Sequence, residues 1–252
     1  MAGKNTVQSV ETALEVVDRL AETEGARLGE LADGLDMPPS TVHSHVATLH
    51  DRNFLAKEGD IYYLSMKFLT LGEQIRRRSA AYQLAEQKVH QIAKETGLRT
   101  HFIVEEEGKA WYLYSVSGDN AITAYASRGK QASLHASAGG KAILAAMPQV
   151  RVEAILDQYT LEAHTGETIT DREELFANLD EIRERGYAYN LEEHLTGVNA
   201  IGTPVTKQSG TVVGAISVSG PATRMKGASI EEDLPNLLME ATNELELNIT
   251  YS

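Results

Sequence analysis

Two serines near the end of the chain have the spacing of a ligand-binding surface. Ser217 and Ser219 lie two residues apart in an otherwise apolar segment that predicts a β-strand, so both hydroxyls should face the same side of a sheet. Hydroxyls that leave water need hydrogen-bond partners, and a polar ligand can supply them. Neighbouring backbone groups can supply them as well, and the residues alone leave these two alternatives equally open.

Small residues precede a predicted helix in the middle of the chain. Ala138, Gly139 and Gly140 lead into a helix expected over 141–147. Such residues expose backbone N–H groups at the positive end of a helix dipole, which suits a carboxylate or a phosphate. A P-loop is excluded, because it requires glycine in place of His135 and serine or threonine in place of Ala142. The alternative is that the glycines only permit close packing.

Signatures of catalysis and metal binding are weak. The chain contains no cysteine, which excludes disulfides, thiolate nucleophiles and thiolate metal sites. No G-x-S-x-G nucleophile elbow surrounds Ser217. A metal-dependent hydrolase would have to use His135, Glu193 and His194, but an acidic segment beside a histidine is more often solvated surface. We therefore expect no enzymatic activity, no cofactor and no metal site.

Residues 28–63 predict a winged helix-turn-helix. A first helix should stop at Met37-Pro38-Pro39, and Ser40 is expected to cap a second helix. Residues 53–64 alternate like a two-stranded wing around a turn at 58–60. The outward face of the second helix carries small polar side chains, as a helix in a DNA major groove does. The residues expected to contact DNA are Ser40, Thr41, His43, Ser44, Thr48 and Arg52.

The charge of the chain opposes this interpretation. The net charge is −13, whereas affinity for DNA normally depends on cations that neutralise phosphates. Residues 1–60 hold eleven carboxylates but only five basic residues, which are Lys4, Arg19, Arg27, Arg52 and Lys57. One explanation is a winged helix that serves only protein–protein assembly. The other, which scarce lysines and evenly spread acids favour, is a protein adapted to high cytoplasmic salt.

The chain divides into three expected parts. These are a DNA-binding domain over 1–65, a linker helix over 66–83 and an effector-binding domain over 84–252. The last part should contain a mainly antiparallel sheet beside long helices, which makes the fold class α+β. Its expected strands cover 100–105, 110–116, 121–127, 199–206 and 211–219, and a final helix covers 230–249. No segment resembles a membrane span or a signal peptide, so we expect a cytoplasmic protein.

Several motifs occur together in an order and at a spacing that are specific. They are Ser9-Val10-Glu11-Thr12-Ala13-Leu14, Gly29-Glu30-Leu31-Ala32, Pro39-Ser40-Thr41-Val42-His43, the segment 134–145, Ile182-Arg183-Glu184-Arg185-Gly186-Tyr187 and the segment 215–221. With them the chain resembles the IclR family of transcriptional regulators over residues 9–249. The resemblance implies a winged helix-turn-helix, a linker helix and a GAF-like effector-binding domain. It also implies homodimers, or dimers of dimers, on double-stranded DNA at palindromic operators.

The resemblance further implies which residues contact the effector. They are Ala138, Gly139, Asn190, Ala200, Ser217 and Ser219. Asn190 stands where the family usually has aspartate, and Ala200 stands where it frequently has cysteine, so a glyoxylate-like or pyruvate-like ligand does not follow. A neutral amide both donates and accepts hydrogen bonds, which also suits a sugar acid or a polyol. We predict a sequence-specific DNA-binding regulator in which a small metabolite, a carboxylate or a sugar acid, shifts the DNA-binding heads through the helix over 66–83.

Overall fold

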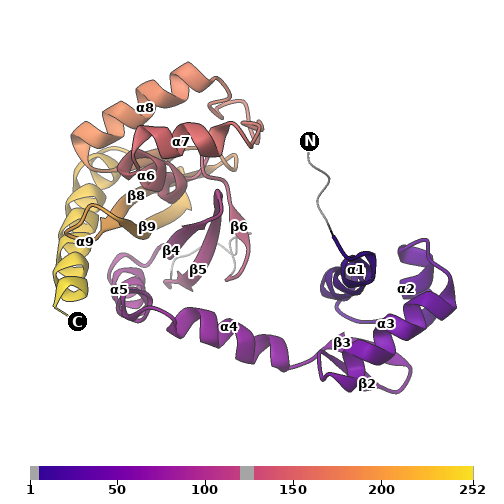
Figure 1. Cartoon of the computed structure of the whole chain (residues 1–252). Helices are drawn as coiled ribbons and strands as arrows, with labels where there is room; N and C mark the ends of the chain where they lie inside the picture. Colours follow the sequence, from indigo (N-terminus) through magenta and orange to yellow (C-terminus); the bar gives the residue numbers. More distant parts are fainter. Residues whose placement is uncertain (1–5, 120–127, 252) are drawn as a thin grey trace. The chain divides into compact units, whose positions relative to one another are not determined.

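The computed structural model describes residues 6–119 and 128–251, so the strand expected over 121–127 lies outside the described residues. The chain forms two compact units, Met1–Arg78 and Ser79–Ser252. Figure 1 shows the helices and strands of each unit. Among the described residues, no helix is both long enough and apolar enough to cross a membrane.

The first unit is a winged helix-turn-helix followed by one further helix. Its elements are α1 (Gln8–Thr23), β1 (Ala26–Arg27), α2 (Leu28–Gly34), α3 (Pro39–Asp51), β2 (Leu55–Glu58), β3 (Ile61–Leu64) and α4 (Lys67–Arg77). The strands form a sheet in the order β1-β3-β2, and Gly59 turns the wing with a φ of +60°, a conformation that favours glycine. The buried core is Val16, Leu20, Ala26, Leu31, Ala32, Val42, Val46 and Leu55.

The start of α3 differs from the expectation. Ser40 was expected to cap this helix, but the helix already begins at Pro39, and Pro38 occupies the cap position without a side-chain hydrogen bond. Proline suits the first helical position because its φ is preset and no intrahelical acceptor waits for its missing N–H. Ser40 therefore lies within the first turn, on the exposed side of the helix.

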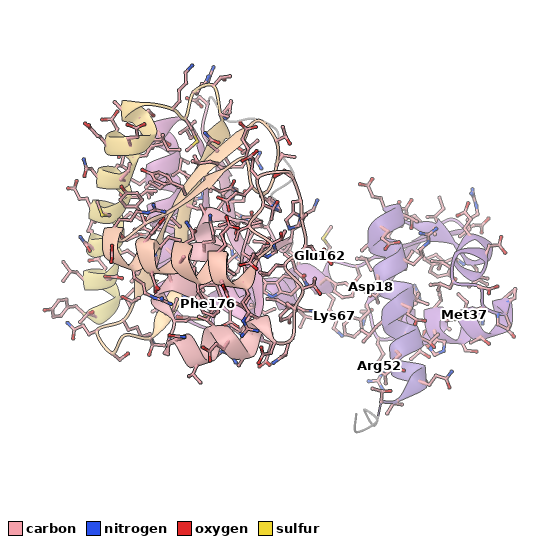
Figure 2. All side chains as sticks on the ribbon, turned by 90° about the horizontal axis from the view of Figure 1, so that it is seen from above. Asp18, Met37, Arg52, Lys67, Glu162 and Phe176 are labelled. Atoms are coloured by element: carbon pink, nitrogen blue, oxygen red, sulfur yellow. The ribbon has the colours of Figure 1, made fainter. Side chains whose placement is uncertain are left out.

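The helix expected over 66–83 is divided into two. α4 ends at Arg77, Ser79 has an extended backbone with φ −137° and ψ 130°, and α5 (Ala80–Thr96) begins after it. Lys67 and Arg52 are labelled in Figure 2. Lys67 fastens α4 to the rest of the first unit, because its Nζ donates to the carbonyl oxygen of Arg52 at 2.9 Å and lies 4.0 Å from the centre of the Phe54 ring. The break therefore coincides with the boundary between the two units.

The second unit is a six-stranded sheet with helices on both faces. The strand order is β6-β5-β4-β9-β8-β7, and the neighbouring strands pair antiparallel. The strands are β4 (Arg99–Glu106), β5 (Lys109–Ser117), β6 (Gln131–Ala132), β7 (Ala188–Leu191), β8 (Val198–Thr206) and β9 (Val212–Pro221). The helices are α5, α6 (Ala138–Ala146), α7 (Gln149–Leu156), α8 (Arg172–Arg185) and α9 (Leu234–Thr250), with a π-helical turn at Ser229–Asp233 before α9.

Strand alternation gives the sheet two buried faces. Phe102, Ile201 and Ile216 pack with α5 and α9 on one face. Ile103 and Ala215 belong to the core with α6, α7 and α8 on the other (Figure 1). The α+β architecture with an antiparallel sheet agrees with the expectation. The polar residues that alternate with Phe102 and Ile216 consequently face α6.

The N-terminus of α6 lies directly on β8. A Cβ atom added at Gly202 would come within 2.7 Å of the carbonyl carbon of Ala138, closer than any side chain can approach a backbone. This glycine therefore allows the helix to begin against the sheet. The helix expected over 141–147 starts three residues earlier than predicted, at Ala138.

Candidate functional site

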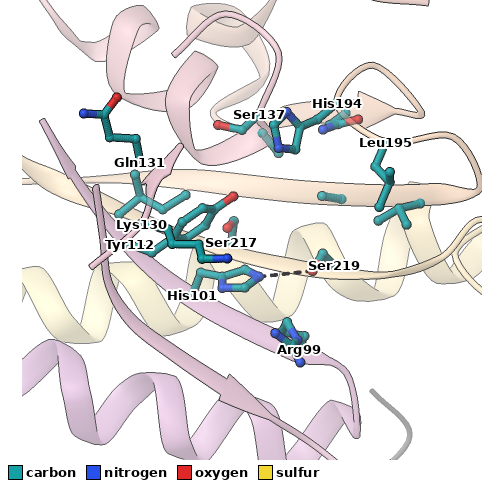
Figure 3. A pocket seen from close by; sticks show the side chains of 15 residues that line it. Arg99, His101, Tyr112, Lys130, Gln131, Ser137, His194, Leu195, Ser217 and Ser219 are labelled. Atoms are coloured by element: carbon teal, nitrogen blue, oxygen red, sulfur yellow. Dashed lines mark hydrogen bonds between the residues drawn. The ribbon is translucent and has the colours of Figure 1, made fainter. Parts of the chain in front are cut away.

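A cavity of about 390 Å³ lies beside the N-terminus of α6. Its walls come from β4, β5, β8, β9, the segment at β6 and the segment that follows β7 (Figure 3). Five of the residues expected to contact an effector line it, namely Ala138, Asn190, Ala200, Ser217 and Ser219. Gly139 does not line it but lies directly behind, where an added Cβ would be 2.5 Å from Ile103 Cδ1 and 3.5 Å from Ser217 Oγ.

The N-terminus of α6 supplies donors to this cavity. Ser137 caps the helix, because its Oγ accepts a hydrogen bond from the N–H of Gly140 at 3.0 Å. The first N–H groups of a helix have no intrahelical acceptor and carry partial positive charge. Ser137 and Ala138 line the cavity, so this end of the cavity attracts an anion.

The opposite wall carries neutral hydrogen-bonding groups. The register of β4 and β9 places His101 opposite Ser217 and Arg99 opposite Ser219. His101 Nε2 and Ser219 Oγ are hydrogen-bonded at 3.2 Å (Figure 3), and the His101 ring centre is 4.9 Å from that of Tyr112. Burial, with Arg99 adding to it, lowers the pKa of His101 to about 3. Burial also raises the pKa of Tyr112 to about 12, so both rings are neutral near pH 7.

Two cations complete the lining. Arg99 and Lys130 both border the cavity, whereas no carboxylate does so among the residues that the structure describes. Sequence reasoning missed Arg99, His101, Tyr112 and Lys130. Alternation along the strand that was predicted over 100–105 would have placed His101 and Ile103 on one face, but only the register with β9 shows that this face meets Ser217.

Asn190 has a structural task in this wall. Its Nδ2 donates to the carbonyl oxygen of Ala136 at 2.8 Å, and its Oδ1 accepts from the N–H of Glu193 at 2.9 Å. The donor and the acceptor of the Asn190 amide are thus both hydrogen-bonded to the protein backbone. The side chain is buried, and it ties the segment after β7 to the segment before α6.

The acidic segment after β7 is not solvated as expected. Glu193 is only 7% exposed, Lys141 is 2% exposed, and both carboxylate oxygens of Glu193 lie 2.6 Å from Lys141 Nζ. Burial lowers the pKa of Lys141 and raises that of Glu193, and each charge offsets part of the shift of the other. A buried carboxylate requires such a partner. Here the partner is 52 residues away in the sequence.

The residues of the hydrolase alternative do not converge on a metal. The carboxylate of Glu193 is bound by Lys141. His135 uses both ring nitrogens, since Nδ1 is hydrogen-bonded to Ser133 Oγ at 3.2 Å and Nε2 donates to the carbonyl oxygen of Glu162 at 3.0 Å. The described residues contain no group of three or more histidines or carboxylates that could hold a metal ion.

The exposed face of α3 carries the residues expected to contact DNA. Val42 and Val46 are buried in the core of the first unit, which turns the other side of the helix to solvent. Ser44 Oγ donates to the carbonyl oxygen of Ser40 at 3.0 Å, and Thr48 Oγ1 donates to that of Ser44 at 2.8 Å. Both hydroxyl oxygens remain able to accept. All six residues expected to contact DNA are exposed, and they are Ser40, Thr41, His43, Ser44 and Thr48 on α3 and Arg52 directly after it.

Comparison with known proteins gives concordant results for both units. Residues 9–59 match the IclR helix-turn-helix domain, and residues 75–246 match the C-terminal domain of bacterial IclR transcriptional regulators. The chain is 32% identical to the probable HTH-type transcriptional regulator ArcR of Halobacterium salinarum over 247 residues, which cover 96% of this chain and 94% of the relative. It is 30% identical to the HTH-type transcriptional regulator BhcR of Paracoccus denitrificans over 95% of this chain and 86% of the relative.

A solved structure has the same fold over almost the whole chain. The crystal structure of the Thermotoga maritima IclR superposes with a TM-score of 0.83 at 26% identity and covers 96% of this chain and 98% of that one. The similarity therefore extends over both units.

Proposed function

Because the chain belongs to the IclR family of DNA-binding transcriptional regulators, we propose that it binds a palindromic operator as a homodimer or dimer of dimers. We further propose that a small carboxylate or sugar acid in the cavity beside α6 controls this binding. A cytoplasmic location follows from these partners.

The residues that line the cavity support the proposed chemical class of the effector. The N-terminus of α6, Arg99 and Lys130 attract an anion. His101 Nδ1 is buried without a hydrogen-bond partner among the described residues, the hydroxyls of Tyr112 and Ser217 line the same cavity, and ligand hydroxyls can bond to these groups. A cavity of about 390 Å³ lies within the range of sites that hold small molecules. A hydroxylated carboxylate matches this combination of charge and neutral donors.

The exposed face of α3 supports the proposal that the chain binds DNA. Thr41, His43 and Thr48 offer hydrogen-bonding groups to base edges, and Arg52 offers a cation to phosphate. Two such helices in a symmetric dimer would read half-sites about one helical turn apart. Exposed apolar side chains support self-association of the first unit; on α1 and α4 they include Val10, Leu14, Leu69 and Ile75.

A single introduced cysteine tests the anion preference of the cavity, since the natural chain has none. The measured quantity is the labelling rate with iodoacetate divided by the rate with neutral iodoacetamide. We expect this ratio to be about tenfold higher for the thiol of Ser217→Cys than for the thiol of Ser209→Cys. Ser209 lies in the exposed β8–β9 turn. Both reagents use the same thiolate, so the ratio cancels differences in thiol pKa. Equal ratios at the two positions would contradict an anion-binding cavity.

DNA selection tests the regulatory part of the proposal. Wild-type chain should enrich palindromic duplexes from a random pool, and a panel of small hydroxy acids and sugar acids should contain one that changes the affinity for the enriched duplex. If no duplex is enriched even at low salt, the winged helix serves protein assembly instead.

A further inference from the structure

The buried pair of Lys141 and Glu193 lies between two walls of the cavity without lining it. Lys141 is one turn after Ala138 on α6, so the two residues share a face of that helix. Glu193 immediately precedes His194 and Leu195, which line the cavity together with Ala138. The two 2.6 Å contacts between Lys141 and Glu193 therefore connect α6, which begins at the cavity, to the segment 192–195, which contributes His194 and Leu195 to its lining.

The backbone of Glu193 is also fixed. Its N–H donates to Asn190 Oδ1, and its carbonyl oxygen accepts from Thr168 Oγ1 at 2.6 Å. Asn190 in turn donates to the carbonyl oxygen of Ala136. The segments before and within α6 are thus joined to the segment after β7 at two places, by the amide of Asn190 and by the ion pair.

Stability alone does not require an ion pair at this place. A buried pair is often no more stabilising than apolar side chains of similar volume, because desolvation opposes the attraction. The positive charge of Lys141 is also disfavoured near a helix N-terminus. What the pair supplies is a fixed distance between two elements, which apolar packing specifies less strictly.

We propose that Lys141 and Glu193 are positioning residues for the effector: the pair sets the separation between the N-terminus of α6 and the segment 192–195, and thereby the access to and affinity of the cavity. This inference rests on the proposed function of the cavity. The alternative is that the pair acts only through its charges, which lie close to a site for anions.

Labelling of the Ser217→Cys chain separates the two explanations. Lys141→Met and Glu193→Gln leave charges of opposite sign, but both remove the two-point ion pair, the first completely and the second down to at most one neutral hydrogen bond. If the pair positions the walls, both variants expose the thiol more often. A tenfold larger population of the locally open state would raise the labelling rate with neutral iodoacetamide by about tenfold. If only charge matters, Lys141→Met raises the thiol pKa and slows labelling with both reagents, whereas Glu193→Gln lowers the thiol pKa and speeds it, and the iodoacetate rate changes more than the iodoacetamide rate. That outcome, or unchanged rates with both reagents, overturns the proposal.

Lys88→Met is the matched control. Lys88 is also buried and pairs with a carboxylate, Glu244, at 2.7 Å, but the pair joins α5 and α9 on the other face of the sheet. This variant should lose stability without changing either labelling rate. If its iodoacetamide rate rose as much as that of Glu193→Gln, general loosening would explain the data and the proposal would fail.

Glu193→Asp provides a conservative variant should Lys141→Met not fold. It keeps the negative charge and shortens only the reach, so positioning predicts faster iodoacetamide labelling than in the parent, whereas a purely electrostatic role predicts the parent rate. The iodoacetate preference of the parent chain tests the anion site itself. If the parent chain shows no preference for iodoacetate while the variants still label faster with iodoacetamide, the proposed class of effector is wrong and the positioning role of the pair is retained.

Discussion

Asn190 donates a hydrogen bond from Nδ2 to the carbonyl oxygen of Ala136, 2.8 Å away. The position thus faces an acceptor, and a carboxylate there would present a second acceptor to it. An asparagine at this position is consequently matched to the backbone geometry. The hydrogen bond from residue 190 to the carbonyl oxygen of Ala136 needs a donor, which an amide or a protonated acid provides and a carboxylate does not. For the wall of the cavity this bond matters more than the missing negative charge.

Asn190→Asp should therefore destabilise the second unit near neutral pH, by about 2 kcal/mol for a buried acceptor that faces another acceptor. The acid would have a raised pKa in the folded chain, so the loss should shrink as the pH falls and the acid becomes a donor. Urea unfolding at pH 5 and pH 8 measures this. A loss that is the same at both pH values would contradict the contact.

Gly139→Ala should destabilise the chain through one defined contact. The added Cβ would lie 2.5 Å from Ile103 Cδ1, and crowding of this kind in a core costs about 1–3 kcal/mol. Ile103→Val removes the Cδ1 atom, so Gly139→Ala should cost much less in the Ile103→Val background than in the natural chain. Gly166→Ala is the control, because an added Cβ there meets nothing within 4 Å. An equal loss in both backgrounds would place the crowding elsewhere.

The pH dependence of folding should contain a contribution from His101. Its pKa is about 3 in the folded chain against an ordinary 6.5. Above pH 6.5 both states are neutral, and this residue contributes nothing to the pH dependence. As the pH falls below 6.5, only the unfolded chain takes up the proton, and the free energy of unfolding should drop by about 2 kcal/mol at pH 5. The stability of His101→Gln should fall less steeply between pH 7.5 and pH 5 in urea unfolding.

Thr41→Ala and His43→Ala should weaken binding to a selected operator. Each loses a side chain that reaches a base edge, which typically costs about 1–3 kcal/mol and relaxes the preference at one position. Gln8→Ala on α1 is the control, since Gln8 is an exposed polar residue of the same unit outside α3. Fluorescence anisotropy on the selected duplex and on single-base variants measures both effects. Unchanged affinity and preference would exclude α3 as the reading helix.

Operator affinity should depend only moderately on salt. In each head Arg52, directly after α3, and Lys57, on the wing, are exposed cations. Two heads that neutralise about four phosphates give a slope of log affinity against log salt of about −4. Arg52→Gln should reduce the magnitude of that slope by about two in a dimer. A slope near −10, as in strongly basic repressors, would contradict this description.

Local patterns predicted most helices and strands to within a few residues, but they did not predict which distant strands pair. The hairpin of β4 and β5 and the alternation that puts Ser217 and Ser219 on one face depend on neighbours in the sequence. The site residues Arg99, His101 and Tyr112 depend on the order β5-β4-β9, which brings together strands more than a hundred residues apart. No local signal contains that order.

Glu193 is the clearest failure of local reasoning. An acidic segment beside a histidine predicts solvent exposure, and the opposite holds because Lys141, itself unremarkable in a helix pattern, neutralises the carboxylate. The division of the helix over 66–83 is a similar case. The amphipathic pattern continues through Ser79, but α4 ends at Arg77 and the backbone of Ser79 is extended.

The attachment of Lys67 to Arg52 and Phe54 also matters for protein engineering. Since α4 is anchored to Arg52, directly after α3, and to Phe54 at the base of the wing, a DNA-binding module cut from this regulator at residue 65 would lose part of its own support. A chimera that grafts this head onto a foreign sensor should instead carry the chain through Arg78 and place the junction at Ser79, where the backbone already leaves the helix.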